Sequence, residues 1–132
     1  MNHSATVQQI YQAFGRGDIP AIIETLAEDV EWEHDALDHG IPWLVPGRGK
    51  SHVLSFFGVV QKELDISQFD VRSILAGENQ VVAVIAIEAT VRSTGKRYRD
   101  FELHLWTFDE RGKVVKFRHI VDTHQHWLAL QP

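Results

Sequence analysis

Ionisable and aromatic residues alternate along one stretch of the chain, between positions 95 and 123. If residues 97–108 form a strand, every second side chain points to the same face. One face would then carry acids, an imidazole and aromatic rings: Tyr98, Asp100, Glu102, His104, Trp106 and Phe108. A solvent-facing surface rarely carries so many large rings, and a core rarely carries two acids and a histidine. The pattern therefore predicts the wall of a partly apolar cavity.

His104 and Asp100 would lie on this face, four residues apart. An imidazole beside a carboxylate is a common way to build a general base with a fixed tautomer. We therefore expect His104 to exchange protons with a substrate, Asp100 to orient its ring, and Glu102 to contact the substrate. The open alternative is a buried histidine that is satisfied by a hydrogen bond across the sheet.

Asp122 comes at the end of a mostly apolar stretch, residues 113–122. If this stretch is a strand that ends at the cavity, desolvation would raise the pKa of the carboxyl group and suit it to proton transfer near neutral pH. We expect Asp122 to be catalytic. An alternative, compatible with the first, is that Asp122 caps a C-terminal helix through the backbone amides of His124 or Gln125.

Two further charged residues are candidates for the cavity wall. Glu88 interrupts an apolar stretch, residues 81–89, and would pair with Arg118 or His104 if its side of the strand faces inward. The alternative for Glu88 is an ion pair that only joins neighbouring strands. Arg118 shares a face with Asp122 and would neutralise an acid or bind an anionic substrate.

Aromatic rings from separate parts of the chain would line or close the cavity, although rings at such spacing more often form plain core. The candidates are Trp32, Trp43, Phe56, Phe57 and Trp106. Trp43 lies in a loop marked by Gly and Pro, residues 35–49, which we expect to fold over a bound molecule.

The elements that would position these residues follow a simple order. Apolar residues at helical spacing predict helices near residues 5–15, 19–26 and 50–63, and alternation predicts strands at 30–34, 69–76, 80–92, 97–108 and 113–122. Helices followed by a run of antiparallel strands indicate the α+β class. Helices packed on one face of a bent sheet would leave a cone-shaped cavity, and the edge of the sheet or the face turned from the helices is a natural dimer surface.

Length and charge limit the function classes. A chain of 132 residues has the size of a single domain, which we assign to 1–132. A net charge of -5 and an isoelectric point near 5.9 disfavour nucleic acid and anionic membranes as partners. The longest apolar run, residues 81–87, is far shorter than a membrane span, and the N-terminus lacks a secretory signal. We therefore expect a cytoplasmic protein.

A metal site is the competing use of the eight histidines. Two local clusters contain them: His34, Asp35, Asp38 and His39 in one, His124 and His126 in the other. Neither cluster has the helical spacing of a metalloprotease, and a flexible acidic loop is a poor zinc cage. The absence of Cys also removes thiolate ligands. We expect neither a metal ion nor any other cofactor.

The segments AFGRGDIPAIIETLAEDVEWE and TGKRYRDFELHLWTFDERGKVVKFRHIVDT resemble the nuclear transport factor 2-like superfamily, specifically its ketosteroid isomerase-related or SnoaL-like branch. The resemblance covers nearly the whole chain. It implies a cone-shaped barrel, made of a strongly curved and mainly antiparallel sheet packed on three N-terminal helices. It also implies a homodimer and a cofactor-free pocket for a small apolar molecule.

The catalytic residues of the family carry over only in part. In ketosteroid isomerases a Tyr of the first helix donates to the oxyanion, and the register puts Ile10 there, with Tyr11 adjacent. The two acids of these isomerases are replaced by His34 and His104. In SnoaL-like cyclases the Asp that ends the last strand acts as acid and base, and Asp122 matches it.

We therefore expect proton transfer on an apolar carbonyl-containing substrate, in an isomerase or aldol-cyclase type of reaction. Asp122 and His104 would be the acid/base pair, Asp100 would orient His104, His34 would lie at the mouth, and Tyr98 or a protonated imidazole would stabilise the oxyanion.

Two other functions stay open. One is a non-catalytic ligand-binding or dimerisation module, which predicts that Asp122 caps a helix, that Arg118 pairs with Glu88, and that no two titratable groups converge on one empty volume. The other is a hydrolase or dehydratase that activates water with the Asp100–His104 pair.

Overall fold

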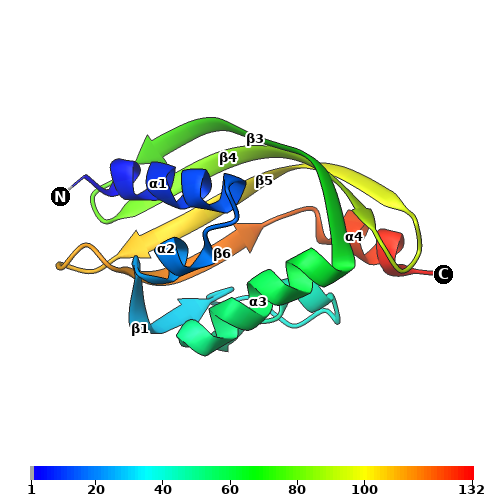
Figure 1. The fold of residues 1–132 in the computed structure, drawn as a ribbon, viewed down its shortest axis with the longest axis horizontal. Helices are drawn as coiled ribbons and strands as arrows, with labels where there is room; N and C mark the ends of the chain where they lie inside the picture. The colour runs from blue at the N-terminus through cyan, green and yellow to red at the C-terminus, as the bar shows by residue number, and fades with distance from the viewer. Residues whose placement is uncertain (1) are drawn as a thin grey trace.

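A computed structural model provides the structure and describes residues 2–132 (Figure 1). Two short helices begin the chain, a longer helix follows the first two strands, and four strands precede a terminal helix. The elements are α1 (His3–Gly15), α2 (Ile19–Ile23), β1 (Leu26–Trp32), the 3-10 helix η1 (Pro42–Leu44), β2 (Gly47–Arg48), α3 (Lys50–Glu63), β3 (Leu64–Ala76), β4 (Gln80–Val91), β5 (Arg97–Phe108), β6 (Val114–Ile120) and α4 (Thr123–Leu130).

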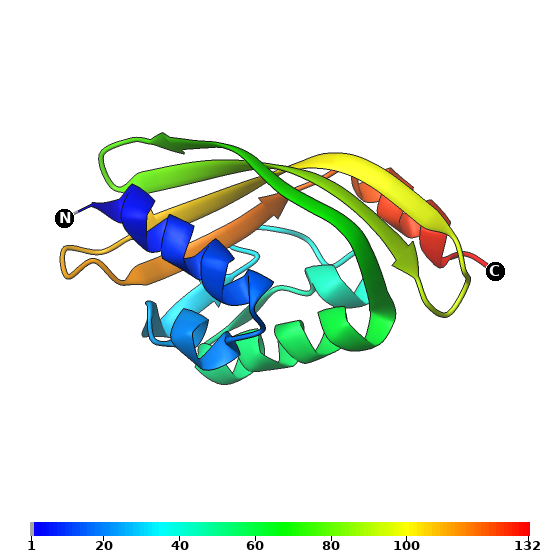
Figure 2. The ribbon, with the colours of Figure 1, turned by 45° about the horizontal axis from the view of Figure 1, so that its top comes forward.

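The strands form one six-stranded sheet in the order β2-β1-β6-β5-β4-β3. Only β1 and β6 pair in parallel; the other neighbours are antiparallel. The sheet is strongly curved but not closed, and α1, α2 and α3 cover its concave face (Figure 2). The predicted α+β class, with a mainly antiparallel sheet on three N-terminal helices, is confirmed.

Local sequence explains where the first helices begin. Asp18 is the N-cap of α2 and accepts a hydrogen bond from the amide of Ala21, with Pro20 in the first turn, as its residue type predicts. Asn2 caps α1 by accepting from the amide of Ala5. These caps set the two helices as a hairpin against the sheet, which places the C-terminal half of α1 over the cavity described below.

The curvature of the sheet comes from β3. Its pairing with β4 shifts between Ile66 and Gln68 and again between Val71 and Ser73. An irregularity of this kind bends the strand and increases its twist. The long strands β3, β4 and β5 consequently arch over α1 and α3 (Figure 2).

The two faces of β5 separate as the alternation predicts. Glu102, His104 and Trp106 are buried on the concave side, whereas Phe101 is 68% exposed and Leu103 37% exposed on the other. The pairing of β5 with β4 runs without a break from Gln80 opposite Thr107 to Thr90 opposite Arg97. A one-residue slip would exchange the two faces, so the unbroken register fixes which side chains reach the interior.

The register of β6 differs from the predicted one. Its pairing with β5 shifts between Thr107 and Phe108, because Thr107 pairs with Lys116 but Phe108 with Val114. As a result Phe117 and His119 point inward.

No helix among residues 2–132 is long and apolar enough to cross a membrane.

Candidate active site

A largely apolar cavity lies between the concave face of the sheet, α1, α3 and the η1 loop. Its interior volume is about 70 Å³. Aromatic rings dominate its wall, and the ionisable side chains in it are Tyr11, Tyr98, Glu102, His104 and His119. Six residues predicted to bind substrate line this cavity: Trp32, Trp43, Phe56, Tyr98, Glu102 and Trp106. Substrate binding by them stays a prediction.

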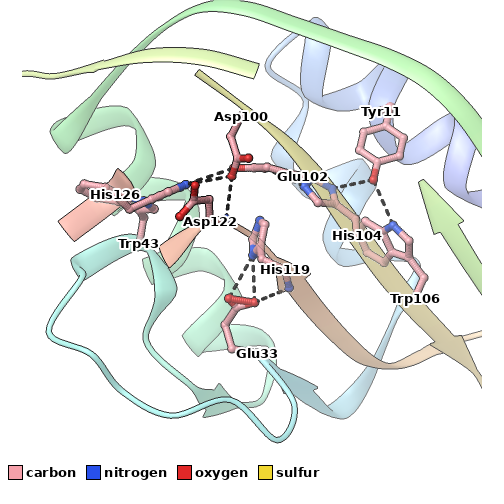
Figure 3. Close-up of polar contacts among 10 residues, drawn as sticks. All are labelled: Tyr11, Glu33, Trp43, Asp100, Glu102, His104, Trp106, His119, Asp122 and His126. Carbon is pink, nitrogen blue, oxygen red and sulfur yellow. Dashed lines mark hydrogen bonds and ion pairs between the residues drawn. The ribbon is translucent and has the colours of Figure 1, made fainter. Parts of the chain in front are cut away.

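The first polar group in the cavity is a chain of hydrogen bonds from α1 to β5 (Figure 3). The hydroxyl oxygen of Tyr11 accepts from Nε1 of Trp106 at 3.1 Å and lies 2.7 Å from Nδ1 of His104. Nε2 of His104 lies 3.0 Å from Oε2 of Glu102. An ionised carboxylate only accepts hydrogen bonds. Nε2 of His104 therefore carries the proton, and Nδ1 accepts from the Tyr11 hydroxyl.

Burial controls the charges in this chain of hydrogen bonds. Desolvation lowers the pKa of His104 against the opposing pull of Glu102, so its ring is neutral. Burial alone would raise the pKa of Glu102, but the hydrogen bond from His104 and nearby imidazoles bring it below its usual value. Desolvation also raises the pKa of Tyr11 far above its usual value, so its hydroxyl stays protonated. The chain therefore holds an ionised acid, a neutral imidazole and a hydroxyl donor.

The second polar group is a dyad formed by Glu33 and His119, with Glu33 2% exposed. Nδ1 of His119 lies 2.9 Å and 3.0 Å from the two carboxylate oxygens of Glu33, and the backbone amide of His119 donates to Oε1 at 2.8 Å. These contacts fix the ring from one side, with Nδ1–H toward the acid. Nε2 makes none of the hydrogen bonds found among the described residues and is available to the cavity.

The dyad has the opposite electrostatic balance from His104. Desolvation lowers the pKa of His119, but the charge and hydrogen bond of Glu33 outweigh it and raise the pKa overall. The rings of His119 and His104 lie edge to face with centroids 4.7 Å apart. Two imidazoles with pKa values moved in opposite directions thus face one cavity, and such divergence is typical of paired acid/base roles.

Backbone conformation explains why Glu33, and not His34, reaches the interior. Glu33 and Asp35 adopt left-handed φ angles of 55° and 62°, which are uncommon for residues other than glycine. This turn aims Glu33 at His119 and directs His34 outward. His34 is 42% exposed and pairs with Glu31 at 2.7 Å. The prediction that His34 lies at the cavity mouth is therefore not met.

Asp100 does not orient His104, contrary to prediction. Its Oδ2 accepts from the amide of Asp122 at 2.8 Å and lies 3.7 Å from Nε2 of His126. The carboxylate two residues along the same face, Glu102, contacts His104 instead. Glu102 takes the place predicted for Asp100 because its side chain is longer and lies more centrally in the sheet.

Asp122 lies outside the cavity. It is exposed and is the N-cap of α4, where its side chain accepts from the amide of Gln125. Hydrogen bonds from the side chain and backbone of Gln125 lower the pKa of Asp122. The predicted desolvation, which would have raised that pKa, is not observed, and the capping alternative describes its contacts.

Glu88 and Arg118 also point away from the cavity. Glu88 forms ion pairs with Arg97 and Arg99, both at 3.4 Å, across β4 and β5. Arg118 donates to the backbone oxygen of Asp35 at 3.1 Å. Both side chains lie on the outer face of the sheet, because Arg118 follows the shifted register of β6. Neither side chain therefore lines the cavity as predicted. Glu88 instead joins neighbouring strands, as its alternative states.

Two groups of side chains have ligand atoms within 4.8 Å of one another: Glu102, His104 and His119, and Asp100, Glu102 and His126. In the first, the hydrogen bond to Glu102 occupies Nε2 of His104 with a proton. In the second, Nε1 of Trp43 donates to Nδ1 of His126 at 2.9 Å, so Nε2 carries the ring proton. A protonated nitrogen has no lone pair for a metal ion. The hydrogen bonding therefore favours proton networks at both places.

Sequence reasoning missed four residues of these networks: Tyr11, Glu33, His119 and His126. Tyr11 had been set aside because the family register pointed to Ile10, yet the end of α1 brings both to the cavity. His119 was missed because the predicted register of β6 faced it outward. A signal was present for Glu33, since it follows Trp32 directly and lies one residue from the position expected to reach the cavity.

Comparison with known proteins supports the fold. Residues 7–117 match the model of the SnoaL-like domain. The chain belongs to the SnoaL-like domain family. The predicted resemblance to the nuclear transport factor 2-like superfamily is thereby confirmed. No curated protein matches this chain.

Several solved structures of SnoaL-like relatives share this fold. An NTF2-like protein from Burkholderia thailandensis has a TM-score of 0.87 and 27% identity, covering 100% of this chain and 99% of its own. An NTF2-like protein from Burkholderia xenovorans has a TM-score of 0.85 and 23% identity, covering 98% and 95%. TerC, co-crystallised with polyporic acid, has a TM-score of 0.81 and 21% identity, covering 98% of both chains.

Proposed function

We propose that this SnoaL-like protein is a small-molecule enzyme that transfers a proton next to a carbonyl group of an apolar substrate. The observation that carries the proposal is the convergence of the Glu33–His119 dyad and the Tyr11–His104–Glu102 chain on one aromatic cavity. An acid/base pair in a nearly dry cavity is effective because charge develops there without competition from water.

His119 is the proton carrier in this mechanism. Above its raised pKa the ring is neutral, and Nδ1–H bound to Glu33 leaves the lone pair on Nε2 facing the cavity. Nε2 takes a proton from the carbon next to the carbonyl, and the electron pair of that C–H bond moves into an enolate. The imidazolium, stabilised by Glu33, then returns the proton to the same or another carbon of the substrate.

Tyr11 stabilises the enolate oxygen. Its hydroxyl is held protonated by burial and is positioned by the Nε1–H of Trp106. When a substrate oxygen binds, the hydroxyl turns its hydrogen from His104 to that oxygen. The Nε1–H of Trp106 still donates to the hydroxyl oxygen and keeps it in place. This assignment moves the oxygen donor from Tyr98 to Tyr11 and the acid/base role from Asp122 and His104 to His119.

The cavity wall favours a planar aromatic substrate. Rings approach from α1, β1, η1, α3 and the sheet, and aromatic faces of this kind stack on flat groups. TerC, whose fold is similar, was crystallised with polyporic acid. We therefore propose an aromatic ketone or its enol as the substrate class.

The ligand-binding alternative makes three structural predictions, and two agree in part with the structure. Asp122 caps α4, and Glu88 is held by arginines, although these are Arg97 and Arg99 instead of Arg118. The third prediction fails, because several titratable groups converge on one cavity. This favours the enzyme. The hydrolase alternative depended on an Asp100–His104 contact, which Glu102 makes instead.

Hydrogen–deuterium exchange at the carbon next to the carbonyl of 2-tetralone tests the proposal by NMR in D₂O. The wild-type protein should accelerate exchange, and His119→Gln should lower the rate by about 10² or more, the range expected for losing a general base. His39→Gln, at an exposed histidine outside the cavity, is the matched control. Exchange that survives unchanged in H119Q would contradict the assignment. No exchange despite binding of 2-naphthol would favour the ligand-binding alternative.

We also propose that two copies associate through the outer face of the sheet. Apolar side chains are exposed there on neighbouring strands: Leu75 (58%), Phe101 (68%), Leu103 (37%) and Ile120 (42%). Leu103 and Ile120 are directly paired in the sheet, so these two side chains adjoin. Light scattering should give a dimer for the wild type and a monomer for Phe101→Glu. A wild-type monomer at high concentration would contradict this.

A further inference from the structure

The helix α4 covers the end of the sheet formed by β4 and β5 (Figure 1) and contributes one fully buried polar residue to the interior, His126. The His126 ring lies 4.0 Å from the ring of Tyr98 and 6.1 Å from that of Trp43, measured between centroids. Tyr98 and Trp43 both line the cavity. The ring of His126 therefore forms the layer immediately behind this part of the cavity wall.

Hydrogen bonding fixes the tautomer of His126. Nε1 of Trp43 can only donate, and it donates to Nδ1 of His126 at 2.9 Å. Burial lowers the pKa of His126, so the ring is neutral and its single proton lies on Nε2. That nitrogen is buried and has no hydrogen-bond partner among the described residues. A buried, unpaired donor costs free energy, so its position calls for a functional reason.

Two carboxylates face this proton. Oδ2 of Asp100 lies 3.7 Å and Oε1 of Glu102 lies 3.8 Å from Nε2 of His126 (Figure 3). The other oxygen of Glu102, Oε2, contacts His104 at 3.0 Å. Glu102 therefore lies between two imidazoles, one in the cavity and one behind it. His104 donates to Oε2 of Glu102, whereas Nε2–H of His126 lies between Oδ2 of Asp100 and Oε1 of Glu102, too far from either oxygen for a hydrogen bond.

We propose that His126 is a positioning residue of the active site, which holds Glu102 in line with His104 through Nε2–H and holds Trp43 over the cavity through Nδ1. One ring then sets both the orientation of the hydrogen-bond chain and the closure of the η1 loop. The inference rests on the proposed function of that chain.

The surroundings leave few other groups that could orient Glu102. The titratable residues around it come from α1, the β1 end, β5, β6 and α4: Tyr11, Glu33, Tyr98, Asp100, His104, His119 and His126. Among the described side chains, only His104 and His126 have an N–H within 4 Å of its oxygens. Loss of His126 removes this electrostatic attraction from Oε1 of Glu102 and leaves the hydrogen bond from His104 to orient the carboxylate.

Two substitutions separate the two contacts. His126→Asn keeps a carbonyl oxygen near the position of Nδ1 and loses the group that reaches Glu102. His126→Gln places an amide nitrogen near the position of Nε2 and loses the acceptor for Trp43. The probes are the ¹⁵N shifts of the His104 ring and the indole N–H signal of Trp43, which need no substrate. Thermal unfolding of each variant measures the purely structural cost.

In H126N the His104 nitrogens should shift while the Trp43 signal stays near its wild-type position, and H126Q should show the reverse. In the 2-tetralone assay, H126N should lower kcat with little change in KM, by less than the roughly tenfold loss expected for a full orienting hydrogen bond, because the contact is a longer electrostatic one. H126Q should mainly raise KM, because Trp43 is released. If H126N does not fold, Trp43→Phe is the second variant. It removes the hydrogen bond that fixes the proton of His126 on Nε2, and it should change the ¹⁵N shifts of His104.

The inference would be overturned if H126N and H126Q gave the same His104 and Trp43 spectra as each other. It would also be overturned if the variants lost stability while the ¹⁵N shifts of His104 stayed unchanged. His126 would then be a structural residue. The spectra and the assay also separate it from the proposed function. His104 nitrogens that respond to H126N in a protein without exchange activity would support the positioning and contradict the function. Exchange activity in a protein whose His104 ¹⁵N shifts do not respond to H126N would support the function and contradict the positioning.

Discussion

The Glu33–His119 dyad gives the most quantitative prediction, because both side chains are nearly out of solvent, with exposures of 2% and 10%. Glu33→Gln keeps the shape and one acceptor oxygen but removes the charge. Since Oε1 accepts from both the amide and Nδ1 of His119, the Gln oxygen can still take these two bonds. The loss is therefore one charge-assisted contact, about 1–3 kcal/mol.

The direction of the pH dependence follows from the raised pKa of His119. A histidine whose folded pKa is raised stabilises the protein fully below its unfolded pKa of about 6.5, and the contribution disappears as pH rises through the folded value. The substitution E33Q should therefore lower the free energy of unfolding more at pH 5.5 than at pH 8.5. The difference between wild type and E33Q should shrink above the folded pKa of His119. Without Glu33, desolvation should bring the pKa of His119 below its usual value.

Urea unfolding at pH 5.5 and 8.5, combined with NMR titration of His119, measures both effects. Glu31→Gln is the matched control, because Glu31 lies two residues away and pairs with His34 at a more exposed position. E31Q should leave the His119 titration unchanged. A His119 that titrates alike in wild type and E33Q, or a stability loss that grows with pH, would refute the electrostatic account of the dyad.

Three further outcomes follow from the same structure. Tyr11→Phe should leave Nδ1 of His104 and Nε1 of Trp106 unpaired, which should cost about 1–3 kcal/mol in urea unfolding; an unchanged stability would contradict the hydrogen-bond chain. The acid limb of kcat/KM in the exchange reaction should lie above about pH 6.5, the usual histidine value, and should move to lower pH in E33Q; a limb unaffected by E33Q would show that His119 is not the base. Asp122→Ala should lower the melting temperature through loss of the α4 cap and leave binding of 2-naphthol unchanged; weaker binding with an intact α4 would return Asp122 to the site.

The fold could be predicted from the sequence because its signals are local. Alternation along 97–108 predicts β5 and its inner face, and Asp18 with Pro20 predicts the start of α2. The family resemblance then added the order of the elements. Side chains on β5 were accordingly placed on the correct face, including Glu102 and His104.

The partners of these side chains could not be predicted in the same way, because they depend on register and backbone detail. One shift between β5 and β6 replaces Arg118 with His119 at the cavity, and one left-handed residue replaces His34 with Glu33. Neither change leaves a trace in hydrophobic periodicity. His126 was seen only as part of a metal-like cluster, because its contact with Trp43 joins residues that are 83 positions apart.

The most direct test of the central claim is a ¹⁵N NMR titration of the histidine rings with and without 2-naphthol, a planar and weakly acidic probe. We predict that His119 titrates above the usual histidine pKa, that His104 stays neutral through the same range, and that both respond to the probe. If His119 titrates at the usual value and neither ring responds to the probe, the two imidazoles do not form an acid/base pair in this cavity.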